Sequence, residues 1–145
     1  MIINPYKEVI ALHDMNILDF KIENNKAFLS LNQAILVKDK KYQVIDDPLI
    51  IINDLLEIKA NEDYPIRIKL INKDNVYNIE PKNFTSYNFT ILEEAYGHNL
   101  VHLYGIATKY SNGYDFMIDI HYCGDIEIRW NEKIPVEVWH GFWNY

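Results

Sequence analysis

The sequence predicts an all-β protein, built mainly of antiparallel sheet as a sandwich or a partly closed barrel, with at most one or two short helices. Apolar and polar residues alternate in many short runs, which is the period of a strand with one buried face. Turn-forming Asn, Asp and Gly separate these runs. The eleven tyrosines suit half-buried strands. With 145 residues, the whole chain 1–145 is expected to fold as one domain.

The first half of the chain predicts a short helix followed by strands. An Asn-Pro pair at positions 4 and 5 is typical of a helix start, and this helix would reach residue 12. Alternation over 16–22 predicts a strand, and Asn24-Asn25 predicts a two-residue turn because both residues tolerate positive φ. The further expected elements are a strand over 26–37 interrupted at Asn32-Gln33, a strand over Tyr42–Ile45, and a strand over Leu49–Ile52 buried on both faces.

The second half continues with hairpins. The clearest pattern is the stretch 99–130, where turn residues 111–113 join two alternating strands and a second reversal at 123–125 leads to a third strand. We expect a three-stranded meander, with Leu100, His102, Tyr104 and Ile106 on one side of its first strand. The other predicted elements are a strand over 53–61, a hairpin of 66–70 with 76–79, a loop at 80–83, a strand over 87–91, a helical turn or loop at 92–98, and an edge strand at 136–138.

The charge balance argues against a nucleic-acid partner. The chain has 14 Lys and Arg against 21 Asp and Glu, a net charge of -7, whereas binding to phosphate backbones depends on clustered basic residues. The last 35 residues, Ser111–Tyr145, hold six of the acids and two of the bases, and they contain all three tryptophans. An acidic surface with large aromatic side chains is suited to a basic protein partner. The alternative is that the acids are solvated strand faces and the tryptophans are core.

The histidines do not form a metal-binding pattern. His98 and His102 are four apart, which on a strand separates them by about 13 Å, too far to share one ion. His102 shares its register with Leu100, so we expect a core histidine with a hydrogen-bond partner. Asp119, His121 and Cys123 follow one strand face, but a metal site requires three or four convergent ligands. We therefore expect no metal, no cofactor and no catalytic residue.

No enzyme motif and no membrane segment is present in the sequence. The five glycines are isolated, so they form neither a P-loop nor a dinucleotide-binding pattern. The longest apolar run, Pro48–Ile52, is far shorter than the roughly 20 residues of a membrane helix. With no signal-peptide pattern at its start and a single cysteine, the protein is expected to be cytoplasmic.

The residues Leu12-His13-Asp14, followed by an alternating strand, the Asn24-Asn25 turn and a second strand up to Leu31, resemble a group of small bacterial β proteins. The stretch Ile118–Trp130 extends the resemblance. Some members of this group are immunity proteins carried beside secreted toxins. The resemblance implies a protein-binding role and transfers no functional residue.

We therefore expect a non-enzymatic protein-binding module, with an immunity-type inhibitor of a basic toxin as its specific form. One alternative is a small-ligand-binding protein or small enzyme with a pocket near Asp119 and His121. A second alternative is a homodimeric structural protein joined through its C-terminal tail and an edge strand. The candidate interaction surface consists of Asp119, His121, Glu127, Arg129, Trp139, Trp143 and Tyr145.

Overall fold

The computed structural model describes residues 2–3, 10–38, 41–56, 66–97, 99–131 and 137–138. It confirms the all-β prediction, because 72% of this part of the chain is strand and it contains one short helix. The elements in chain order are β1 (Ile2–Ile3), β2 (Ile10–Ala11), β3 (Asn16–Glu23), β4 (Lys26–Leu31), β5 (Gln33–Lys38), β6 (Lys41–Asp46), β7 (Leu49–Asn53), β8 (Ile66–Asn72), β9 (Asn75–Asn78), the 3-10 helix η1 (Pro81–Ser86), β10 (Asn88–Gly97), β11 (Leu100–Lys109), β12 (Asn112–His121), β13 (Ile126–Arg129) and β14 (Glu137–Val138).

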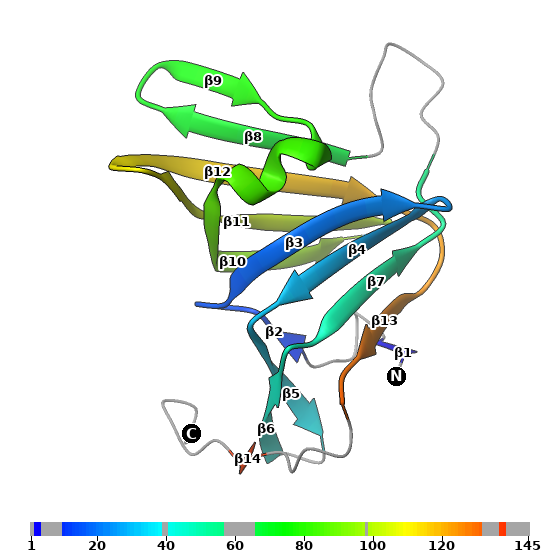
Figure 1. Ribbon diagram of the computed structural model, residues 1–145. Helices are drawn as coiled ribbons and strands as arrows, with labels where there is room; N and C mark the ends of the chain where they lie inside the picture. Colours follow the sequence, from blue (N-terminus) through cyan, green and yellow to red (C-terminus); the bar gives the residue numbers. More distant parts are fainter. Residues whose placement is uncertain are drawn as a thin grey trace.

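The strands form two antiparallel sheets (Figure 1). The larger sheet has the order β1-β13-β7-β4-β3-β10-β11-β12-β8-β9, and the smaller one has the order β14-β6-β5-β2. The larger sheet bends back on itself. Its strands β3, β4, β7 and β13 form a front layer, and β10, β11 and β12, continued by β8 and β9, form a rear layer (Figure 1).

The bend lies between β3 and β10. These strands pair only through Ile17 opposite Phe89 and Asn16 opposite Thr90, whereas β11 and β12 pair along their whole length. A two-residue ladder leaves the remaining parts of β3 and β10 free to diverge into different layers. At one end the layers meet again, where Leu55 bridges Tyr122. The described strands do not close into a barrel, so of the two predicted architectures, a sandwich or a partly closed barrel, the structure is consistent with the sandwich.

A row of phenylalanines connects the two layers. Phe84 of η1 stacks on Phe89 of β10 with ring centroids 3.9 Å apart, and it also contacts Phe20 of β3 at 5.4 Å. Phe89 in turn meets Phe116 of β12 edge-on at 5.1 Å. All four rings are buried. Such ring pairs contribute about 0.5–1.5 kcal/mol each beyond the area they bury, so η1 fills the space between the layers.

The predicted inner face of the 99–109 strand is wrong by one residue. In β11 the odd-numbered positions from Val101 to Ala107 are buried, and His102 lies on the outer face. Gly105 is consistent with this inward face of β11, because a Cβ at this position would lie 2.7 Å from the Phe116 ring, so the space beside the ring admits only a glycine. The inward row consists of Val101, Leu103, Gly105 and Ala107. Because it contains a glycine, it looks less apolar in the sequence than the alternate row of Leu100, His102, Tyr104 and Ile106.

The third strand of the predicted meander is also placed differently. β13 does not pair with β12 but lies beside β7 in the front layer. The reversal at 123–125 is hydrogen-bonded to the end of β7, since the Cys123 amide donates to the Asp54 carbonyl and the Gly124 amide donates to the Asn53 carbonyl. These bonds direct the chain across to the front layer, so residues 100–121 form a hairpin rather than part of a meander.

Four further predictions need correction. Residues 10–11 are strand, so the predicted helix does not extend to residue 12; its part over 4–9 lies outside the described residues. The predicted strand at 53–61 ends at Asn53, because Asp54 has a φ of 57°, and residues 57–61 are outside the described part. Residues 81–86, which overlap the predicted loop, form η1. Residues 92–97 continue β10 through a bulge between Ile91 and Glu93 instead of forming a helical turn.

Candidate functional site

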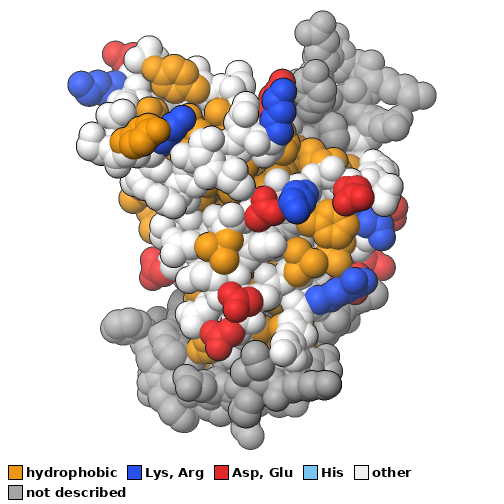
Figure 2. Space-filling model, viewed as in Figure 1, with side chains coloured by type: hydrophobic (Ala, Val, Ile, Leu, Met, Phe, Trp, Pro, Cys, Tyr) orange, Lys and Arg blue, Asp and Glu red, His pale blue; other side chains and the backbone are white. Residues whose placement is uncertain are grey.

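The outward side chains of β3, β4, β7 and β13 form one surface, here called the front face. The hairpin of β3 and β4 places Lys21 opposite Phe28 and Asp19 opposite Ser30. The next strand, β7, places Ile51 opposite Phe28 and Leu49 opposite Ser30. In Figure 2 hydrophobic side chains lie on this face with acidic and basic side chains around them. The front face therefore combines an apolar centre with a charged surround.

The front face carries a hollow of about 260 Å³ over β3, β4 and the start of β7. Its apolar part is formed by Phe28 and Leu49, both of which are only partly exposed. Beside Phe28, Ile51 faces outward and is nevertheless 2% exposed, so the apolar centre is well packed. The residues that line the hollow are Asp19, Lys21, Glu23, Phe28, Ser30 and Leu49.

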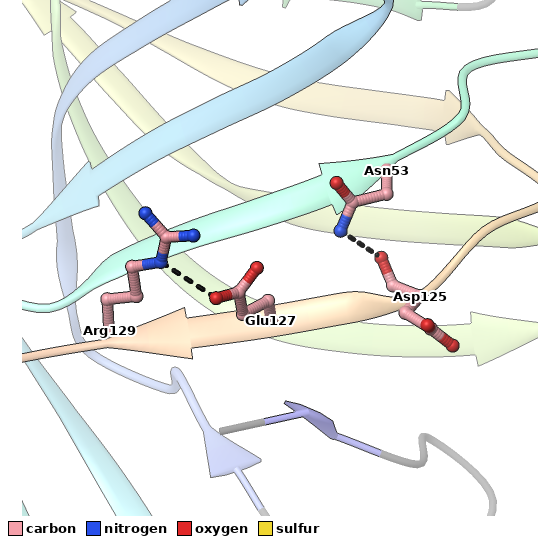
Figure 3. Close-up of polar contacts among 4 residues, drawn as sticks. All are labelled: Asn53, Asp125, Glu127 and Arg129. Carbon is pink, nitrogen blue, oxygen red and sulfur yellow. Dashed lines mark hydrogen bonds and ion pairs between the residues drawn. The ribbon is translucent and has the colours of Figure 1, made fainter.

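Two of the predicted site residues, Glu127 and Arg129, lie on this face. In β13, Glu127 is opposite Ile51 and Arg129 is opposite Leu49. The Arg129 Nε donates to Glu127 Oε1 at 2.7 Å (Figure 3), and this bond lowers the pKa of Glu127. Glu127 is therefore ionised at neutral pH, and the two side chains place opposite charges at the border of the apolar centre.

A second polar contact fixes the position of β13 on the front layer. The Asn53 side-chain amide donates to the Asp125 carbonyl at 2.9 Å (Figure 3). The Asn53 backbone amide donates to the same carbonyl at 3.0 Å. Because both donors come from the last residue of β7, they hold the beginning of β13 in register with it. These two hydrogen bonds thus fix the positions of Glu127 and Arg129 along β7.

Asp119 and His121, the other described members of the predicted surface, lie elsewhere. Both belong to β12 and point outward from the rear layer. The strand order separates β12 from β13 by β7, β4, β3, β10 and β11. The front and rear layers present their outer faces in opposite directions (Figure 1), so the structure does not bring Asp119 and His121 together with Glu127 and Arg129.

On the rear layer, Asp119 lies between two basic side chains. It is opposite His102 on one side, where the carboxylate contacts His102 Nδ1, and opposite Arg67 on the other side. The predicted hydrogen-bond partner of His102 is therefore present, but the predicted core position is wrong because its side chain is 29% exposed. The packing of β11 explains this, since Val101 and Leu103 occupy the inward positions.

The remaining predicted residues, Trp139, Trp143 and Tyr145, lie outside the described part, as does His98. Trp130 is partly buried and packs against the core. Cys123 is exposed and donates weakly to the Asp54 carbonyl.

Sequence reasoning missed Glu94, a carboxylate in a largely buried environment between the two sheets. Its Oε1 accepts a hydrogen bond from the Leu12 amide, and its Oε2 accepts one from the Tyr96 hydroxyl, both at 3.0 Å. Burial raises the pKa of Glu94, and burial together with the neighbouring carboxylate raises the pKa of Tyr96. The pair Glu93-Glu94 reads as ordinary surface charge in the sequence, and only the bulge in β10 turns Glu94 inward.

The predicted surface also lacked four residues of the front face, Asp19, Glu23, Phe28 and Leu49. A signal for them existed, because a two-residue turn at 24–25 fixes the pairing of Lys21 with Phe28 and so their common face.

The described residues include no candidate group of metal ligands and no candidate membrane-spanning helix. They contain no group of three or more His, Cys, Asp or Glu side chains able to hold an ion. Within the same ranges, no helix has the length and apolar character that crossing a membrane requires.

Comparison with family models, curated proteins and solved structures finds no match to this chain. Its class is therefore set by the fold alone, an antiparallel all-β protein with a mixed apolar and charged outer face.

Proposed function

We propose that this protein is a non-enzymatic protein-binding module and that the front face is its docking surface. The observation that carries the proposal is the partly exposed apolar pair Phe28 and Leu49, packed beside the buried Ile51 and surrounded by charges. Interfaces commonly have such an apolar core with a polar rim, and their energy is concentrated in a few central side chains.

The partner is expected to be a basic protein. The net charge of -7 favours encounter with a positively charged surface and raises the association rate at low salt. An immunity-type inhibitor of a basic toxin is the specific form of this proposal, and it rests on the resemblance of the N-terminal hairpin to small bacterial immunity proteins.

The geometry gives less support to a ligand pocket near Asp119 and His121. Neither the hollow on the front face nor a small apolar cavity in the core is lined by Asp119 or His121. The homodimer alternative rests on the C-terminal tail, of which residues 139–145 are outside the described part. A mass measurement in solution separates it from the monomeric module, since it predicts twice the mass of one chain.

The test is capture of partners from the source organism at low and high salt, followed by titration of the purified partner against variants. Leu49→Lys places a positive charge in the apolar centre, which a basic partner disfavours, and is expected to weaken binding by about 30-fold or more, the effect of losing one strong interface contact. Ile106→Lys is the matched control, because Ile106 is an exposed apolar side chain on the rear layer. Equal weakening by both variants, or by neither, contradicts the proposal.

A further inference from the structure

The hollow on the front face has the shape and charge of a receptor for one long cationic side chain. Its floor is apolar, formed by Phe28 of β4 and Leu49 of β7. Asp19 and Glu23 of β3 stand along one side of it. A side chain with an aliphatic stem and a positive end satisfies both parts, because the stem covers the floor and the charge reaches the carboxylates.

The charged side chains that line the hollow favour a cation over an anion; of the cations nearby, Arg129 opposite Leu49 is paired with Glu127, and Lys26 lies opposite Glu23. Two carboxylates and one ammonium group line it. The ammonium of Lys21 lies 3.5 Å from Asp19 Oδ2, and its side chain is 70% exposed. An exposed lysine gains little from such a pair, so an incoming cation can displace it. Glu23 is exposed and is a second acceptor for that cation.

Phe28 favours arginine among the cationic side chains. A guanidinium stacks on an aromatic face and binds a carboxylate through two parallel hydrogen bonds, whereas an ammonium is a compact and strongly hydrated charge. The protein already contains a contact of the cation–π kind, since Lys109 Nζ lies 5.1 Å from the centre of the Tyr87 ring. We propose that the hollow binds one arginine side chain of the partner protein, between Phe28 and the carboxylates of Asp19 and Glu23.

The proposal can be tested without the partner. The ¹⁵N-labelled protein is titrated with N-acetyl-arginine methylamide and, in parallel, with the citrulline analogue, which has nearly the same shape and no charge. We expect the arginine probe to bind with a dissociation constant on the order of 1 mM and to shift the amide signals of Phe28, Ser30 and Leu49. The citrulline probe is expected to bind at least tenfold more weakly. Equal shifts from both probes, or no saturable shift, overturn the proposal.

Two variants give effects of opposite sign. Lys21→Gln removes the competing ammonium and is expected to tighten arginine binding about fivefold. Glu23→Gln removes an acceptor and is expected to weaken it by a similar factor. Glu93→Gln is the matched control, because Glu93 is an exposed glutamate on β10 in the rear layer. Weaker arginine binding in Lys21→Gln contradicts the assignment.

This inference rests on the proposed function, and the two fail separately. If the arginine probe does not bind while Leu49→Lys abolishes binding of the partner, the arginine receptor is wrong and the docking surface stands. If the probe binds while Leu49→Lys leaves the partner's affinity unchanged, the hollow is a cation site and the docking surface is wrong.

Discussion

Replacement of Glu94 tests how the small sheet is held to the large one. Glu94→Ala leaves the Leu12 amide and the Tyr96 hydroxyl without their acceptor. An orphaned buried polar group costs about 1–3 kcal/mol. Because the Tyr96 hydroxyl can turn toward other partners, we expect a total loss of about 2–4 kcal/mol in the free energy of unfolding. Glu94→Gln keeps an amide oxygen for Leu12 and is expected to change the free energy of unfolding by less than about 1 kcal/mol at acidic pH.

The pH dependence supplies a sharper test of the same residue. Burial raises the pKa of Glu94 above its ordinary value of 4.5, so the folded protein holds this proton more tightly than the unfolded chain does. The resulting stabilisation is complete below about pH 4.5 and is lost as the pH rises through the pKa of the folded state. Glu94→Gln has no proton to lose, and it is therefore expected to gain stability relative to the wild type as the pH rises.

Urea unfolding, measured at several pH values from about 4 to 7, gives both results. Glu93→Gln serves as the control, since it removes the neighbouring carboxylate, which is exposed on the outer face of β10. A difference between Glu94→Gln and the wild type that does not change with pH would refute the reasoning.

Three other substitutions test the fold and the rear layer. Phe84→Ala removes the ring that stacks on Phe89, and we expect a loss of about 3–5 kcal/mol in urea unfolding; a loss below about 1 kcal/mol would show that η1 does not fill the core. Gly105→Ala places a Cβ 2.0 Å from the Thr90 carbonyl oxygen and is expected to lower the thermal midpoint by at least several degrees, whereas an unchanged midpoint would contradict the close approach. Asp119→Asn changes a pair that is 29% exposed on each side, so its cost is expected to stay within about 1 kcal/mol, and a larger loss would indicate that the pair has a structural role.

The local pattern of this fold was readable from the sequence. Asn24-Asn25 forms the predicted two-residue turn, with φ of 51° and 59°. The break at Asn32 separates β4 from β5, which belong to different sheets. Leu49–Ile52 was expected to be buried on both faces, and Ile50, Ile51 and Ile52 are all at most 5% exposed, whereas Leu49 is partly exposed. Each of these features depends on neighbours within a few residues.

The errors come from contacts between distant residues. The inward face of β11 depends on the space that Gly105 leaves for Phe116. The turn between β11 and β12 is formed by Tyr110 and Ser111 rather than by the Asn-Gly pair that follows, and Tyr110 itself takes a φ of 56°. The pairing of β13 depends on hydrogen bonds to Asn53 and Asp54. No property of residues 123–130 alone identifies β7 as their partner.

The candidate site was only partly predicted for the same reason. Glu127 and Arg129 are on the front face, but the predicted surface combined them with Asp119 and His121 because these residues are close in sequence. A tight reversal usually keeps neighbouring strands together, and here it carries the chain from the rear layer to the front one. The docking surface that we propose instead combines strands that are far apart in the sequence, namely the hairpin of β3 and β4, the strand β7 and the strand β13.

The most direct test of the docking surface is hydroxyl-radical footprinting of the protein alone and in complex with its purified partner. The method reports the solvent exposure of individual side chains. We predict that Phe28 and Leu49 become protected in the complex while Ile106 and Tyr110, which are exposed on the rear hairpin, keep their labelling. Protection of Ile106 and Tyr110 with unchanged labelling of Phe28 and Leu49 would contradict the account and assign binding to the rear layer.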